Sequence, residues 1–237
     1  GFLHKGAGAL FDGIAYDIPV SMLMEQGYLS PVISKGGLNQ IDLTNVKKRG
    51  GEFIESDLAT AASDPELVRK TVAEIVELSA DRKSWLVFSS GVNHAYMLKD
   101  EFEAHDIDVG VVTGSDSSAV REKTIADFKN GDLKCLINVN VLTTGFDHPA
   151  VDSVSLCRAT ASCGLYIQMI GRGTRVAEGK KDCLVCDFGA NVERHGFIDR
   201  VKPKDKSAGA GEGTAPVKMC EACQTMCFAA ALQCHVC

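Results

Sequence analysis

Two arginines stand three residues apart in the segment QMIGRGTR, residues 168–175. If this segment is helical, Gln168, Arg172 and Arg175 project from one face, because they are separated by four and three residues. The glycines beside the arginines keep that face low enough for a large ligand to approach. A guanidinium is always charged and presents a planar fork of donors that fits phosphate oxygens. The segment therefore predicts a site that stabilises negative charge in phosphoryl transfer, with a solvated basic helix end as the ordinary alternative.

A second candidate is the turn TTGFDHP at residues 143–149. Gly145 would let the backbone come close to a ligand, and Thr143 and Thr144 could donate hydrogen bonds to phosphate oxygens. Asp147 could accept a hydrogen bond from a ribose hydroxyl. Taken alone, the segment is also typical of an ordinary turn between a strand and a loop.

The third candidate is a cysteine cluster in the last 18 residues. Two C-x-x-C pairs lie ten residues apart, and four thiolates at this spacing can bind Zn²⁺ tetrahedrally at ~2.3 Å. A segment this short has no core of its own, so a metal would supply one. We predict a structural zinc site, with disulfides or free thiols as alternatives, and we leave Cys227 and His235 out of it. The predicted ligands are Cys220, Cys223, Cys234 and Cys237.

Alternating helices and apolar strands must position these candidates. A cap at Ser63 or Asp64, followed by Pro65 and apolar residues at helical spacing, predicts the first of the regularly alternating helices. The expected strands are 85–90, 107–113, 133–139, 151–157 and 182–188, and the later helices are 92–105, 117–131 and 165–173. Strands that are apolar on nearly every residue indicate an α/β fold with a doubly wound parallel sheet. In the last strand, Cys183 and Cys186 would point to opposite faces, so we interpret them as core residues.

Loops that follow the strands are where such a sheet binds ligands, because ligands lie beyond the carboxyl ends of parallel strands. We therefore expect chemistry in SSGVNH, TGSD and NVLTTGFD, and we place the QMIGRGTR helix at the same edge.

Composition narrows the class of protein. The chain has 237 residues, a formal charge of −6 and 45% hydrophobic residues, which is ordinary for a globular protein. Residues 1–171 carry a net charge of −8 and residues 172–237 a net charge of +2, a weak sign of polyanion binding. No apolar run reaches the ~20 residues of a membrane span, and no signal peptide is evident at residues 1–20, so we expect a soluble cytoplasmic protein without a membrane partner. Both ends look cut, which suggests a fragment.

In this order, the segments WLVFSSGVNHA, VTGSD, INVNVLTTGFDHPAVDSV, YIQMIGRGTR and CLVCDFGANVERHG resemble the second RecA-like lobe of superfamily 2 helicases. They are similar in particular to the bacterial RadD-type DNA-repair helicases and their phage relatives, over roughly residues 1–200. The resemblance implies that Arg172 and Arg175 reach across a cleft to the γ-phosphate of ATP, with Arg175 as the finger and Gln168 as a support. It places Gly145 and Asp147 between the nucleotide and the other lobe.

The resemblance also implies a nucleic-acid track. Small hydroxyl and amide donors would hold the phosphate backbone of one strand independently of sequence, in single-stranded or forked DNA, with RNA also possible. Related helicases often have a nucleic-acid-binding threonine where Val139 stands, so that contact would come from its neighbours. The zinc element would contact DNA or a partner protein, although Lys218 is the only basic residue beside it. The implied track residues are Ser89, Ser90, Gly91, Thr113, Gly114, Thr143 and Thr144.

The sequence contains neither a G-x-x-x-x-G-K-[ST] loop nor a D-E-x-H box. The surfaces that bind the ATP phosphates and Mg²⁺ would therefore lie in a first lobe outside this sequence, and we predict that the chain alone does not hydrolyse ATP. We expect residues 1–30 to be the tail of that lobe, 31–62 a connector, 63–201 the second lobe, 202–218 a flexible linker and 219–237 the zinc element. A non-catalytic nucleic-acid-binding module and the motor subunit of a restriction complex are the alternatives.

Overall fold

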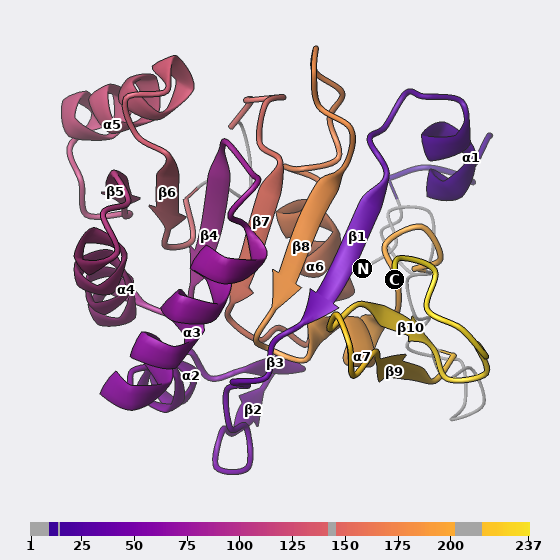
Figure 1. Cartoon of the computed structure of the whole chain (residues 1–237), viewed down its shortest axis with the longest axis horizontal. Helices are drawn as coiled ribbons and strands as arrows, with labels where there is room; N and C mark the ends of the chain where they lie inside the picture. The colour runs from indigo at the N-terminus through magenta and orange to yellow at the C-terminus, as the bar shows by residue number, and fades with distance from the viewer. Residues whose placement is uncertain (1–9, 14, 142–145, 202–214) are drawn as a thin grey trace.

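The computed structural model describes residues 10–13, 15–141, 146–201 and 215–237. Its centre is a six-stranded sheet in which every neighbouring pair is parallel, in the order β1-β8-β7-β4-β6-β5 (Figure 1). The strands are β1 (Val32–Gly36), β4 (Trp85–Ser89), β5 (Val109–Val112), β6 (Cys135–Asn138), β7 (Ser153–Cys157) and β8 (Cys183–Asp187). The predicted parallel α/β sheet is confirmed. Thr143, Thr144 and Gly145 lie outside the described residues.

Helices cover both faces of the sheet. On one face lie α3 (Pro65–Leu78) and α4 (Val92–Ala104), and on the other lie α5 (Ser118–Asn130) and α6 (Cys163–Ile170). Strand β4 serves both layers, because Trp85 and Val87 join the first core cluster and Leu86 and Phe88 join the second. Cys186 packs in the first cluster and Cys183 in the second, and both are 0% exposed. The prediction that these two cysteines are core residues on opposite faces is confirmed.

Local sequence signals set the helix ends. The Asp64 carboxylate accepts a hydrogen bond from the amide of Leu67 (2.8 Å), and Pro65 opens α3, as the sequence predicts. Ser117 caps α5 in the same way, and Gly131 ends that helix with a positive φ of 87°. None of the helices in the described part of the chain is long and apolar enough to cross a membrane.

The range expected to be a connector contributes to the fold. Strand β1 pairs along its length with β8, and β2 (Lys48–Arg49), β3 (Glu52–Phe53) and α2 (Glu55–Ala62) follow it with a small core of their own. The sheet therefore begins inside residues 31–62, while the position of the domain boundary stays a prediction. The sequence hides β1 because an edge strand is short and carries polar residues, here VISKG.

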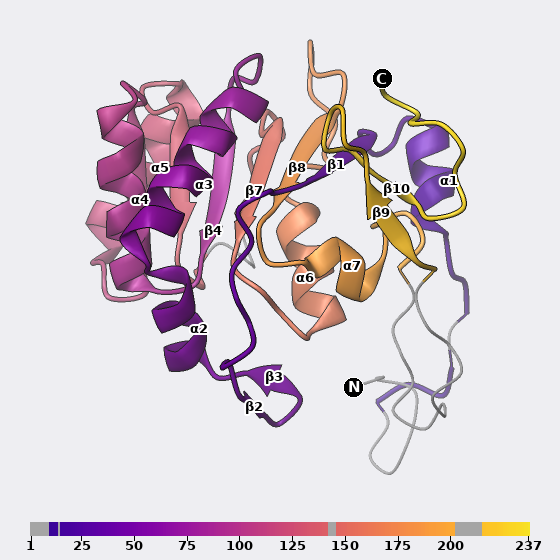
Figure 2. The same cartoon turned by 60° about the horizontal axis from the view of Figure 1, so that its bottom comes forward.

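The C-terminal cysteine segment packs against the outer edge of β1 (Figures 1 and 2). It contains the antiparallel pair β9 (Val217–Met219) and β10 (Met226–Phe228). The amide of Gly36 donates to the carbonyl of Gln224 at 3.0 Å, and the rings of Phe197 and Phe228 meet edge to face at 4.8 Å. The segment is thus in contact with the sheet, although the sequence suggests a separate unit behind a linker.

Candidate functional site

The two arginines converge on one carbonyl. Arg172 Nη1 donates to the carbonyl oxygen of Phe146 at 2.7 Å, and Arg175 Nη1 donates to the same oxygen at 3.1 Å. Arg175 also forms an ion pair with Asp147. The structure therefore brings together three of the predicted site residues, Arg172, Arg175 and Asp147, while Gln168 is exposed on α6.

The helix does not carry the arginines, contrary to expectation. Helix α6 ends at Ile170 with Gly171 as its C-cap, residues 171–173 form a turn, and Arg175 lies at a bend. Both arginines thus lie on a compact segment after the helix, which we call the arginine turn (residues 171–175). Their meeting at Phe146 depends on the fold of that turn and on the segment after β6.

The arginine turn also lies at the other edge of the sheet from the one expected. A Cβ added at Gly173 would lie 2.2 Å from Cys183 Sγ and 2.8 Å from Val154 Cγ2, and these residues stand at the beginnings of β8 and β7. The turn therefore occupies the amino-terminal edge. The reason is the direction of α6, which starts after the carboxyl end of β7 and runs back along the sheet.

Charge and exposure leave the pair open to an anion. The Arg175 side chain is 33% exposed and that of Asp147 is 72% exposed. The pKa of Arg172 is lowered, mainly by burial and to a smaller extent by the neighbouring charge of Arg175. Two like charges held close together, one of them on a partly exposed side chain, favour the binding of a further negative group.

The hydroxyl groups predicted to hold nucleic acid are engaged within the protein. Ser89 Oγ donates to the carbonyl of Gly91 and Ser90 Oγ to that of Cys157, both at 2.9 Å. Thr113 Oγ1 lies 2.8 Å from a neighbouring serine hydroxyl. All three side chains are buried, with exposures of 0%, 4% and 1% for Ser89, Ser90 and Thr113. These hydroxyls shape the loops at the carboxyl-terminal edge and do not face solvent.

Other groups at this edge remain candidates for ligand contact. Gly91 is half-buried at the N-cap of α4, and Gly114 is exposed. Sequence reasoning missed Arg158, which directly follows β7 and is 5% exposed. Its guanidinium donates to the side chain of Asn140 and lies 4.0 Å from a carboxylate oxygen of Glu55. An arginine that interrupts the apolar run VSLCRAT was the sequence signal for it.

Sequence reasoning also missed residues at the arginine turn itself. The Phe146 contact is made by a backbone carbonyl, which no side-chain pattern reveals. Lys180 Nζ donates to the carbonyls of Gly173 (2.6 Å) and Arg175 (2.8 Å). Lys180 stands in the polar stretch AEGKK, where it looks like any solvated lysine.

The four predicted metal ligands form one group. All four Sγ atoms of Cys220, Cys223, Cys234 and Cys237 lie within 4.8 Å of one another, and two of the separations are 3.6 Å and 3.7 Å. A tetrahedron with Zn–S bonds of ~2.3 Å has edges of ~3.8 Å, whereas a disulfide would require ~2.05 Å. The cluster thus has the donor set and spacing of a four-thiolate zinc site. Cys227 and His235 lie outside this group and contact each other at 3.7 Å between Sγ and Nδ1.

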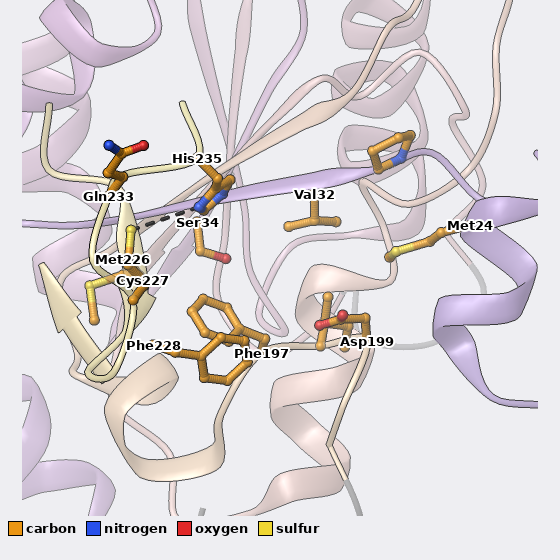
Figure 3. A pocket seen from close by; sticks show the side chains of 13 residues that line it. Met24, Val32, Ser34, Phe197, Asp199, Met226, Cys227, Phe228, Gln233 and His235 are labelled. Atoms are coloured by element: carbon orange, nitrogen blue, oxygen red, sulfur yellow. Dashed lines mark hydrogen bonds between the residues drawn. The ribbon is translucent and has the colours of Figure 1, made fainter. Parts of the chain in front are cut away.

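A cavity of about 440 Å³ lies between the cysteine segment, β1 and the chain after α7 (Asn191–His195) (Figure 3). Its walls are mainly apolar, with Val32, Phe197, Met226 and Phe228 among the lining residues. Ser34 also faces it. The cavity belongs to the contact between the cysteine segment and the sheet and does not include the arginine turn.

Comparison with known families finds a match to the part of the chain that contains the arginine turn. Residues 67–177 match the model of the helicase conserved C-terminal domain. This part of the chain is similar to helicase C-terminal domains and has their RecA-like fold. The match begins in α3 and ends just after Arg175, so this domain carries both arginines, Asp147 and the loops at the carboxyl-terminal edge. Strand β1 and the cysteine segment lie outside the matched residues.

Two relatives are similar to this chain over a longer stretch than the family model matches. One is IRC3 of Saccharomyces cerevisiae, which is named as an ATP-dependent helicase. It is 29% identical to this chain over an alignment that covers 78% of this chain and 27% of IRC3. The 51.5 kDa protein of Lactococcus phage (isolate 7-9) is 25% identical over 84% of this chain and 45% of its own. The chain thus spans less than half the length of both relatives.

A solved structure shares the fold. It is a fragment of a protein named as an HsdR subunit of a type I restriction enzyme from Vibrio vulnificus YJ016, with a TM-score of 0.57. The match covers 79% of this chain and 38% of that chain at 21% identity. It supports a RecA-like helicase C-terminal fold.

Proposed function

We propose that this chain is the second motor lobe of an ATP-dependent DNA helicase or translocase that acts in DNA repair or phage DNA metabolism. The observation that carries the proposal is the convergence of Arg172 and Arg175 on the Phe146 carbonyl beside Asp147. A helicase C-terminal domain that presents two partly exposed guanidinium groups side by side can complete an ATP site formed by another lobe.

The arginines would act on the substrate ATP as charge stabilisers. Negative charge spreads over the phosphate oxygens in phosphoryl transfer, and a guanidinium held in place stabilises it without reorganising. We assign Arg175 as the finger, with Arg172 as its partner and Gln168 as a support. The Phe146 carbonyl and the Asp147 carboxylate would hold the guanidinium groups extended until the γ-phosphate replaces them as acceptor. Asp147 would then be free to accept from a ribose hydroxyl, and we assign to Gly145 the close approach of the backbone to the nucleotide.

The nucleotide phosphates and Mg²⁺ would be bound by a first lobe. The described residues offer the arginine turn no partner loop of the phosphate-binding kind, and the sequence has none. We therefore expect the chain alone to release no phosphate from ATP. This expectation follows from the chemistry, since a finger stabilises charge on a phosphate that another surface must orient.

The nucleic-acid track would run along the carboxyl-terminal edge of the sheet. Because the Ser89, Ser90 and Thr113 hydroxyls are internally bonded, we assign the contacts of their loops to the backbone at Gly91 and Gly114. Thr143 and Thr144 would add hydroxyl donors. Backbone phosphate contacts of this kind suit single-stranded or forked DNA and do not by themselves exclude RNA, so DNA and RNA should be compared as activators of ATP hydrolysis.

The cysteine cluster would bind Zn²⁺ as a structural ion through Cys220, Cys223, Cys234 and Cys237. The spacing of the sulfur atoms supports this assignment. Four thiolates around one ion would hold the β9–β10 segment closed on the edge of β1, and its outer surface would be available to a partner protein or DNA.

The test is ATP hydrolysis by a protein in which this chain follows its nucleotide-binding lobe. We expect Arg175→Ala to lower turnover by ~10³ or more, and Arg172→Ala to lower it substantially, because a finger arginine contributes about this factor. Arg69→Ala is the matched control, since Arg69 is an exposed arginine on α3. Unchanged turnover with Arg175→Ala would remove the assigned role, and turnover by the isolated chain would contradict the division between lobes.

A further inference from the structure

The arginine turn is fixed through its backbone. Three consecutive carbonyls, those of Gly173, Thr174 and Arg175, all accept hydrogen bonds from outside the turn. Among the residues that the structure describes, the donors are Lys180 and Ser30. The position of both guanidinium groups therefore depends on two residues that are distant from the Phe146 contact point in sequence.

Lys180 joins the two segments that form the arginine site. Its ammonium donates to the carbonyls of Gly173 (2.6 Å) and Arg175 (2.8 Å) on the turn, and to that of Pro149 at 3.2 Å. Pro149 lies three residues after Phe146, in the segment that presents the shared carbonyl. One ammonium with three donors thus ties the arginines to the segment that they contact.

The ammonium of Lys180 is used for backbone hydrogen bonds. Lys180 is half-buried, and among the described residues no carboxylate forms an ion pair with its ammonium. Its ammonium donates hydrogen bonds to three neutral carbonyls, a set that satisfies all three N–H groups. A lysine that serves only solubility keeps its ammonium in water, because partial burial of a charge without an anion is unfavourable. Burial indeed lowers the pKa of Lys180.

Ser30 fixes the turn from the other side. Its amide donates to the carbonyl of Thr174 at 2.6 Å, and its hydroxyl donates to the carbonyl of Arg175 at 3.0 Å. Ser30 is 3% exposed and directly precedes Pro31 and β1. The close approach of Gly173 to Cys183 leaves no room for the turn to move toward the sheet.

From this network we infer that Lys180, together with Ser30, is a positioning residue for the arginine pair. The inference rests on the proposed function of Arg172 and Arg175. Neither positioning residue is assigned a contact with the nucleotide. Each acts through the backbone of the arginine turn, and Lys180 also sets the distance between that turn and the Phe146 segment.

The experiment measures ATP turnover in the two-lobed protein. Lys180→Met keeps the aliphatic stem and removes the ammonium, and we expect kcat to fall ~10- to 100-fold, since a displacement of ~1 Å at a reacting group has an effect of this size. KM for ATP should change far less. Lys180→Arg restores a cationic donor and should recover part of kcat. The matched control is Lys181→Met, because Lys181 is exposed at the next position, and its kcat should equal that of the wild type.

Combining substitutions shows whether Lys180 acts through the finger. If it does, Lys180→Met lowers kcat by a smaller factor in the Arg175→Ala background than in the wild type, because only Arg172 then remains to be positioned. Ser30→Ala removes one oxygen atom and should lower kcat ~3- to 10-fold. It provides a second test of the inference if Lys180→Met fails to fold. Thermal unfolding of each variant identifies folding failures.

The outcomes separate the two proposals. Unchanged turnover with Arg175→Ala would refute the proposed function itself. A large loss with Arg175→Ala, together with wild-type kcat for both Lys180→Met and Ser30→Ala, would overturn the inference and leave the function standing. Losses that multiply in the double variant would also overturn it, because Lys180 would then act independently of Arg175.

Discussion

Substitution of Gly173 by alanine probes the packing that places the arginine turn. An added Cβ would lie 2.2 Å from Cys183 Sγ and 2.8 Å from Val154 Cγ2, where ordinary contacts between heavy atoms are ~3.5–4.0 Å. Both neighbours are 0% exposed, so neither side chain can move into solvent. Overpacking of this kind destabilises proteins by ~1–3 kcal/mol, and two simultaneous overlaps place Gly173→Ala near the upper end.

Urea unfolding of the chain measures this effect directly. We expect Gly173→Ala to lower the free energy of unfolding by ~2–3 kcal/mol, and Gly164→Ala to raise it by up to ~1 kcal/mol. Gly164 is the matched control, because it is exposed in the first turn of α6 and its added Cβ would lie 3.8 Å from Ser162 Oγ. Adding Cys183→Ala, which removes the sulfur atom, should recover part of the loss caused by Gly173→Ala. Equal stability of the two glycine variants would show that the turn does not pack against the strands as described.

Three further predictions concern the metal, pH and a helix cap. Elemental analysis of the purified chain should find one zinc ion. Cys223→Ser should abolish zinc binding and Cys227→Ser should retain it, since only Cys223 belongs to the four-sulfur group. Zinc retained by both variants would refute the ligand assignment. Burial lowers the pKa of His94 to about 4 in the folded protein. As pH falls below ~6.5, the unfolded state therefore binds a proton that the folded state does not. The free energy of unfolding should drop by ~3 kcal/mol between pH 6.5 and 4. His94→Gln should flatten this part of the pH–stability curve measured by urea unfolding, and an unchanged slope would contradict the assignment. Asp64→Ala removes the cap of α3 and should lower the unfolding free energy by ~1 kcal/mol, whereas no change would show that the cap bond is not formed in solution.

The sequence predicts the sheet well where burial on both faces leaves a continuous apolar run. Trp85–Ser89 is an example, since every residue of this strand is buried. The edge strand β1 was missed because its outer side meets the cysteine segment, so its residues are mixed in character. Cysteine spacing is similarly informative, because two C-x-x-C pairs specify a ligand set before any fold is known.

The site was harder to predict because it depends on chain direction and backbone atoms. Arg172 and Arg175 were identified by their residue type, but their place at the amino-terminal edge follows from the path of α6, which spacing does not reveal. Serine hydroxyls at Ser89 and Ser90 looked available, yet nearby carbonyls accept their hydrogen bonds. Lys180 could not be found from sequence because its ammonium donates to three backbone carbonyls, which no side-chain pattern reveals.

A structure of the two-lobed protein with a non-hydrolysable ATP analogue tests the central claim most directly. The quantity to measure is the distance from the Arg172 and Arg175 guanidinium groups to the γ-phosphate oxygens. We expect at least Arg175 to lie at hydrogen-bonding distance, ~2.7–3.2 Å, with its contact to Asp147 released. Guanidinium groups that remain on the Phe146 carbonyl and Asp147, away from a closed and occupied nucleotide site, would contradict the account.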